Sequence, residues 1–209
     1  MTAVHAVVAV KGFERGKYRL AGVLTEAQQH LLISTMFNGV LDALRATPGI
    51  ASINVLSNDL AVLPKDVEQI VDPGTGLSAA IANAARVLSN EGAHSMLFLP
   101  ADLPFITADD IGALLAAAKD HDAVIAPDAR HFGTNALLLT PPQLIEPQFG
   151  EQSFTAHVQA IRCSAAKSLH ILERPALAHD IDVPADLHAL SGGFRKCYQF
   201  VDTVLRKAS

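Results

Sequence analysis

A short segment near the start of the chain gathers four basic side chains directly after an apolar run. The run covers residues 5–10 and ends at Lys11, and the polar loop behind it carries Arg15, Lys17 and Arg19. Cations at the end of a strand neutralise a polyphosphate and fix its geometry during phosphoryl or nucleotidyl transfer. Lys11, Lys17 and Arg19 are therefore candidate catalytic residues, and the two lysines are candidate nucleotide-binding residues. The alternative is a solvated basic loop.

An aspartate between two prolines is the second candidate. Asp102 lies in the segment LPADLP, at the end of the strand predicted at 95–99, which is apolar from Met96 onward. Proline fixes its own φ, so this carboxylate stands on a rigid turn, and Mg²⁺ binds to one or two carboxylates together with substrate phosphates. Asp180 and Asp182 point the same way on an extended segment, so one of them could supply a second carboxylate. We expect Asp102 and Asp182 to bind Mg²⁺. The alternatives are a turn or capping role for Asp102 and helix caps for the other two.

The segment GTGLSA at 74–79 has the spacing G-x-G-x-x-A in front of a predicted helix. This spacing occurs in dinucleotide-binding turns, which would indicate a nicotinamide cofactor. Such turns normally follow the first strand of their unit, whereas here the preceding strand is short and Pro73 interrupts it. A glycine loop that lets a base or a phosphate approach the backbone fits equally well. In that interpretation the nucleotide-binding residues here are Asp72, Gly76, Leu77 and Ser78.

Two further segments place polar groups in front of a strand and a helix. Thr134 and Asn135 stand at the entry of the strand predicted at 135–139, and Gly150 and Ser153 stand just before a predicted helix. Free backbone N–H groups at a helix start, together with a hydroxyl, suit a phosphate or a carboxylate. The alternative for Ser153 is an ordinary helix N-cap.

Short β-branched runs alternate with Ala/Leu-rich stretches, which predicts a three-layer α/β/α sandwich with a mostly parallel mixed sheet. Ligands of such folds lie beyond the carboxyl ends of the strands, so the segments above should meet at one rim. The predicted strands are 5–10, 52–56, 69–71, 95–99, 123–126, 135–139 and 169–172. The predicted helices are 25–46, 78–90, 109–119, 153–162 and 184–190. We expect one domain at 1–191 and a C-terminal tail at 192–209 with an amphipathic helix at 194–207.

Composition limits the class of protein. The 209 residues are 50% hydrophobic and carry a net charge of −5, which suits one α/β core and argues against a nucleic-acid partner. No apolar run reaches the roughly 18 residues of a membrane span, and no signal-peptide pattern is evident, so no membrane partner is expected. The two cysteines form no disulfide framework, which favours a cytoplasmic setting. The histidines show no metal spacing, and His30, His157 and His188 are interpreted as surface or packing residues.

Taken in order, these segments resemble the 2-phospholactate or phosphoenolpyruvate guanylyltransferase family of deazaflavin coenzyme F(420) biosynthesis. The resemblance rests on VAVK with KYRL, DPGTGLSAA, LPADLP, GTNALLL, FGEQSF and DIDVPADL, within residues 4–190. It implies a Rossmann-like nucleotidyltransferase fold of the nucleotide-diphospho-sugar transferase type, with GTP as a substrate and Mg²⁺ as a cofactor. It also implies that Thr134, Gly150 and Ser153 bind the acceptor. Ser78 departs from the family, whose loop has asparagine at this position.

The resemblance implies transfer of GMP from GTP to a phosphorylated three-carbon acid, with release of pyrophosphate. The acceptors of the family are 2-phospholactate, phosphoenolpyruvate and 3-phosphoglycerate. One alternative is a nucleotidyltransferase of the same fold that uses a sugar phosphate or a molybdenum cofactor precursor, although the first loop lacks the LAGGxSxRMG-like pattern of such enzymes. A nicotinamide-dependent oxidoreductase and a ligand-binding module are the others. Small-molecule substrates are the expected partners, and a homodimer stays open.

Overall fold

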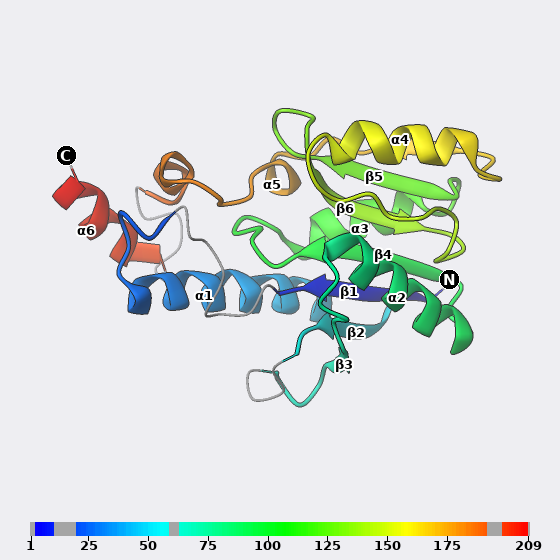
Figure 1. Cartoon of the computed structure of the whole chain (residues 1–209), viewed down its shortest axis with the longest axis horizontal. Helices are drawn as coiled ribbons and strands as arrows, with labels where there is room; N and C mark the ends of the chain where they lie inside the picture. The colour runs from blue at the N-terminus through cyan, green and yellow to red at the C-terminus, as the bar shows by residue number, and fades with distance from the viewer. Residues whose placement is uncertain (1–2, 11–19, 59–62, 192–197, 209) are drawn as a thin grey trace.

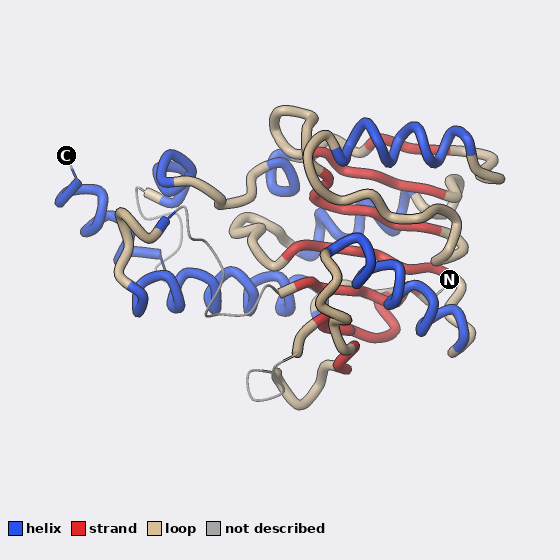
Figure 2. The backbone as a smooth tube through the Cα atoms, in the orientation of Figure 1, coloured by secondary structure: helices blue, strands red, loops and turns tan. Residues whose placement is uncertain are grey.

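The computed structural model describes residues 3–10, 20–58, 63–191 and 198–208. Its centre is a seven-stranded sheet with the order β3-β2-β1-β4-β6-β5-β7 (Figures 1 and 2). The strands are β1 (Val4–Ala9), β2 (Ile50–Leu56), β3 (Glu68–Ile70), β4 (Ser95–Pro100), β5 (Ala123–Pro127), β6 (Thr134–Leu139) and β7 (Leu169–Ile171). All neighbouring strands are parallel except β6, which runs antiparallel to β4 and β5. The predicted mostly parallel mixed sheet is confirmed.

Helices cover both faces of the sheet, because strand side chains alternate between two cores. Ala6 and Val8 of β1 pack in the core that α1 and α3 share, whereas Val7 packs in the core of α2 and α4. The helices are α1 (Glu26–Arg45), α2 (Leu77–Asn90), α3 (Ala108–Ala117), α4 (Ser153–Cys163), α5 (Pro175–Ala178), the 3₁₀ helix η3 (Pro184–Leu190) and α6 (Gln199–Ala208). None of the helices in the described ranges is long and apolar enough to cross a membrane.

The helix starts follow the sequence closely, with one exception. Thr25 and Thr107 are N-caps that accept the N–H of Gln28 and Asp110, at 3.3 and 3.4 Å. The N-cap of α4 is instead Gln152, which has a left-handed φ of 57° and makes no side-chain cap bond. Ser153 is the first helical residue, so its interpretation as an ordinary N-cap is wrong.

A register shift at the start of β6 re-aims its first side chains. Ala126 of β5 lies opposite Ala136, but Pro127 lies opposite Thr134, so β6 holds one residue more than β5 at this point. Such a bulge bends a strand and redirects a side chain. Ala136 packs in the core of α1 and α3, yet the hydroxyl of Thr134 reaches His157 of α4 on the other face. Because β6 is antiparallel, its start lies at the same rim as the ends of β1 and β4.

A third apolar cluster surrounds the first half of α1, beyond the sheet. Leu32 and Met36 of α1 pack there with Leu187 of η3 and Val201 of α6. Figure 1 shows α6 beside this end of α1, far from the strands. The helix predicted at 194–207 is observed as α6, and residues 192–197 lie outside the described residues. The division into a domain at 1–191 and a tail at 192–209 stays a prediction.

Candidate active site

Three carboxylates meet at the rim of the sheet. Carboxylate oxygens of Asp102, Asp180 and Asp182 all lie within 4.8 Å of one another. Asp102 lies two residues after the end of β4, and the two others lie between α5 and η3. The N–H of Ile181 donates to the carbonyl oxygen of Asp102 at 3.3 Å, which ties the two segments together. The buried Ile181 side chain turns inward, so its two neighbours turn toward Asp102, as an extended segment requires.

The helix-cap interpretation of Asp180 and Asp182 does not hold. The N-cap of η3 is Val183, which makes no side-chain cap bond. The carboxylate of Asp186, inside the first turn, instead accepts the N–H groups of Asp182 and Val183, both at 2.8 Å. The predicted metal ligands were Asp102 and Asp182, and the structure places Asp180 in the same carboxylate cluster. The two-residue spacing of the aspartates was the signal for including both.

The electrostatics of this carboxylate cluster favour a bound cation. Burial raises the pKa of Asp180, and the negative charges of Asp102 and Asp182 raise it further. The side-chain amide of Asn135 counters this in part, because its Nδ2 donates to Asp180 Oδ1 at 3.3 Å and to the carbonyl of Leu177 at 2.9 Å. Three oxygen ligands at this spacing fit a hard divalent cation such as Mg²⁺.

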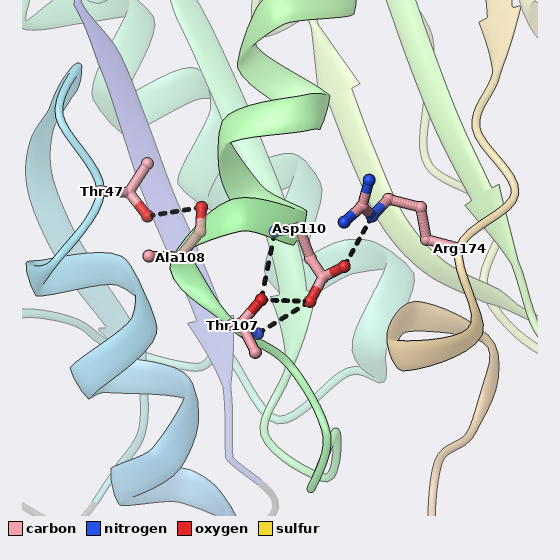
Figure 3. Close-up of polar contacts among 5 residues, drawn as sticks. All are labelled: Thr47, Thr107, Ala108, Asp110 and Arg174. Atoms are coloured by element: carbon pink, nitrogen blue, oxygen red, sulfur yellow. Dashed lines mark hydrogen bonds and ion pairs between the residues drawn. The ribbon is translucent and has the colours of Figure 1, made fainter.

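An ion pair between the buried Asp110 and the half-buried Arg174 holds the segment that leads to these aspartates. Figure 3 shows Asp110, at the start of α3, between Thr107 and Arg174. Asp110 Oδ2 accepts the hydroxyl of Thr107 at 2.6 Å, and its Oδ1 accepts Nε of Arg174 at 2.6 Å. Arg174 directly precedes α5, whose Leu177 carbonyl binds Asn135. This contact therefore fixes the approach of the chain to Asp180, and sequence reasoning missed it.

A second polar cluster lies where β6 meets α4. Thr134 and Ser153 are buried, and their hydroxyl oxygens are 3.4 Å apart. His157, one turn after Ser153 on the same face of α4, is fully buried and places Nδ1 3.0 Å from Thr134 Oγ1. Gly150 precedes the helix with a φ of 138°, which favours glycine. The structure thus brings Thr134, Gly150 and Ser153 to one place, as predicted.

The interpretation of three histidines as surface or packing residues is correct only in part. His30 and His188 are exposed, but His157 is more than a packing residue, since both of its ring nitrogens make hydrogen bonds. The four-residue spacing between Ser153 and His157 on one helix face was the signal in the sequence.

The glycine loop stands next to this hydroxyl cluster. Gly76 is the N-cap of α2 with a φ of 106°, and Asp72 Oδ1 accepts the N–H of Gly74 at 2.8 Å, which shapes the turn. The hydroxyl of Ser78 bonds to the backbone of Phe149. Leu77 is the first residue of α2. The nucleotide-binding roles of these residues stay predictions, and Lys11, Lys17 and Arg19 lie outside the described residues.

Known proteins are similar to this chain over most of its length. A family model described as guanylyl transferase CofC like matches residues 4–204. The chain belongs to this family. This guanylyl transferase is 38% identical over 196 residues to the phosphoenolpyruvate guanylyltransferase of Sphaerobacter thermophilus, which covers 92% of this chain and 94% of the relative. It is 40% identical over 198 residues to the enzyme of the same name from Rubrobacter xylanophilus, with 91% and 96% covered. The 3-phospho-D-glycerate guanylyltransferase of Phenylobacterium zucineum is 30% identical over 201 residues, with 90% of each chain covered.

Solved structures confirm the fold of this guanylyl transferase. A nucleotide-diphospho-sugar transferase-like protein from Desulfovibrio desulfuricans has a TM-score of 0.75 at 18% identity, with 99% of this chain and 95% of that chain covered. A CMP:2-keto-3-deoxy-manno-octonic acid synthetase in complex with CTP has a TM-score of 0.60 at 15% identity, with 90% and 97% covered. The predicted nucleotide-diphospho-sugar transferase type of fold is therefore correct. Family membership makes the protein a nucleotidyltransferase and removes the oxidoreductase and binding-module alternatives.

Proposed function

We propose that the protein transfers GMP from GTP to a phosphorylated three-carbon acid in deazaflavin coenzyme F(420) biosynthesis, with phosphoenolpyruvate as the first acceptor to test. The observation that carries this proposal is the meeting, on one rim, of three carboxylates and a buried hydroxyl pair at the start of α4. The carboxylates suit a cation that holds a triphosphate, and the hydroxyl pair suits a small anion. The names of the most similar relatives support the choice of acid.

The proposed reaction needs no general base. An oxygen of the acceptor phosphate is ionised at pH 7 and forms the new bond to the α-phosphorus of GTP. The bond from that phosphorus to the bridging oxygen breaks, and pyrophosphate leaves with the electron pair. Repulsion between the two anions is the main barrier, so positive groups supply most of the catalysis.

Each predicted residue has a place in this proposal. Asp102, Asp180 and Asp182 would hold Mg²⁺, which when bound neutralises charge on the phosphates of GTP. Lys11, Lys17 and Arg19 are proposed to bind and polarise the triphosphate. The loop residues Asp72, Gly76 and Leu77 are proposed to contact the nucleotide, and Ser78 to support that loop. Thr134, Gly150 and Ser153 are proposed to bind the acceptor. We place the enzyme in the cytoplasm with small-molecule partners, and a homodimer stays open.

The test is mass spectrometry of the products formed from GTP and Mg²⁺ with each acid in turn. Phosphoenolpyruvate, 3-phosphoglycerate and 2-phospholactate are the acids, and glucose 1-phosphate is the control acceptor. We expect a diphosphate-linked guanosine product and equimolar pyrophosphate with at least one acid, and neither with the control. Product from the sugar phosphate alone, or pyrophosphate release without any acid, would contradict the proposal.

A further inference from the structure

The ring of His157 has a fixed proton arrangement. Its Nε2 accepts the backbone N–H of Gln148 at 2.8 Å, and a backbone N–H can only donate. Burial lowers the pKa of His157 to about 4, so the ring is neutral at pH 7. A neutral imidazole with a lone pair on Nε2 carries its proton on Nδ1. The ring therefore donates from Nδ1 to Thr134 Oγ1 across the 3.0 Å contact.

This donation sets the polarity of the hydroxyl pair formed by Thr134 and Ser153. The pair has two hydroxyl protons, and the 3.4 Å contact uses that of Ser153, whose hydroxyl donates to Thr134 Oγ1. Among the described residues, no other protein group accepts a proton from either hydroxyl. One O–H therefore remains to donate to a ligand. A free donor at the start of the eleven-residue helix α4 suits an anionic oxygen.

The same ring also holds the loop that carries Gly150. Gln148, whose N–H binds Nε2, lies two residues before Gly150, and the ring of Phe149 packs against His157 at a centroid distance of 4.6 Å. The N–H of Ser153 donates to the carbonyl oxygen of Gly150 at 3.2 Å. One buried side chain thus contacts the elements that carry all three proposed acceptor-binding residues.

We propose that His157 is a positioning residue of the acceptor site, which turns the Thr134–Ser153 hydroxyl pair into a hydrogen-bond donor for the acceptor anion. This inference rests on the proposed function, because the acceptor is the three-carbon phospho-acid. His157 does not touch the reacting atoms. It acts through the hydroxyl pair and the 148–150 loop.

Two substitutions separate the two hydrogen bonds of the ring. In His157→Asn the amide nitrogen takes the place of Nδ1, so donation to Thr134 is kept and the bond from Gln148 is lost. In His157→Gln the amide oxygen takes the place of Nε2, so the bond from Gln148 is kept and donation to Thr134 is lost. We expect the Gln variant to raise the acceptor KM about tenfold or more, and the Asn variant to raise it only a few fold. The KM for GTP should change by less than about twofold in both.

A double substitution tests whether His157 affects acceptor binding through its hydrogen bond to Thr134. It remains informative if one of the single variants folds poorly. Thr134→Val removes the hydroxyl, and Thr134→Ser retains it as the matched control. Adding Thr134→Val to His157→Gln should cost little more than either change alone, because both break the same chain of hydrogen bonds. Equal acceptor KM values for the Asn and Gln variants, or fully additive effects with Thr134→Val, would overturn the inference.

A readout that needs no activity is the nitrogen-15 NMR spectrum of the histidine rings at pH 7. We expect the signals of one ring to report a protonated Nδ1 and an unprotonated Nε2. These signals should be missing from the spectrum of His157→Asn, which assigns them to His157. The opposite tautomer or a doubly protonated ring overturns the inference. If the unmodified protein transfers GMP to no acid, the proposed function fails and takes the acceptor role of His157 with it. If it does transfer GMP but the variants behave alike, only the inference fails.

Discussion

Ser78 and Phe149, 71 residues apart in the chain, are joined by two hydrogen bonds. The N–H of Phe149 donates to Ser78 Oγ at 2.8 Å, and the hydroxyl of Ser78 donates to the carbonyl oxygen of Phe149 at 3.3 Å. Ser78 lies in the first turn of α2, directly after the glycine loop, and Phe149 precedes Gly150. The proposed nucleotide loop and the proposed acceptor loop are therefore connected by one hydroxyl.

Replacement of Ser78 should affect the acceptor more than the nucleotide. In Ser78→Ala the backbone of Phe149 loses both partners, which should cost about 1 kcal/mol of stability and raise the acceptor KM several fold. The measurement is a thermal melt together with both KM values. Ser89→Ala, on the same helix, is the control. A rise in the KM for GTP alone would instead support the predicted direct contact between Ser78 and the nucleotide.

Asp102→Asn should keep the fold and remove most of the activity. Loss of one carboxylate from a three-carboxylate cation site plausibly lowers kcat by roughly 10²–10³. Calorimetric titration with Mg²⁺ and GTP should show weaker cation binding as well. Asp109→Asn, an exposed aspartate in the first turn of α3, is the matched control and should behave like the unmodified protein. Near-normal turnover of Asp102→Asn at saturating Mg²⁺ would contradict the metal role.

The basic loop should bind the triphosphate. Lys11→Ala and Lys17→Ala are each expected to weaken GTP binding about tenfold, because a charge-assisted hydrogen bond to phosphate is lost. The identity of the accepted acid should not change. Calorimetry with GTP measures the effect, and Lys65→Ala, an exposed lysine elsewhere, is the control. Unchanged GTP affinity in both variants would show that the loop is only a solvated basic segment.

Ser153→Ala should raise the acceptor KM about tenfold and leave the KM for GTP within about twofold, since the hydroxyl pair loses one member. Because Gln152 is the N-cap, helix stability should change little. Thermal melts and both KM values on this variant and on Thr155→Ala, the exposed control on the same helix, provide the check. A drop in melting temperature without a selective change in KM would leave Ser153 only a packing role.

Stability should fall in acid through His157. Burial lowers its pKa from 6.5 to about 4, so the unfolded chain binds a proton in this range that the folded protein does not. The stability contributed by the neutral ring is complete above about pH 6.5 and is lost as the pH falls toward 4, by about 1.4 kcal/mol per unit. Urea unfolding at pH 7.5, 6 and 5 should show a shallower decline for His157→Asn. The exposed His188→Asn variant should keep the original slope, and a shared slope for all three proteins would refute the assignment.

The sheet and the rim were predictable because they follow from local patterns. The apolar run 96–99 requires cover on both faces, and the strand-end rule then places Asp102 at the rim. The spacing of Asp180 and Asp182 predicts a common direction, but their approach to Asp102 depends on the bond from Ile181, a contact between distant segments. Local sequence patterns thus place the aspartates at the rim, and long-range packing brings them together.

The acceptor side was less predictable. Alternation along residues 135–139 assigns Asn135 to the same face as Leu137, whereas the bulge places Thr134 on the α4 face and lets Asn135 reach Asp180. The bonds from Phe149 to Ser78 and from Gln148 to His157 join residues whose proximity no periodicity encodes. A fully buried histidine in an otherwise half-exposed helix also shows no distinct local pattern.

The extra residue at the start of β6 fixes the length of the β5–β6 connection. Deletion of one residue from the connection between 128 and 133 would bring Asn135 opposite Pro127 in regular pairing. By the two-residue repeat of a strand, Thr134 would then turn toward α1 and α3. The hairpin between Asp128 and Thr134 can therefore accept exchanged side chains more readily than a changed residue count. A library that aims to alter the acid used by this enzyme should randomise identities in this hairpin and hold its length constant.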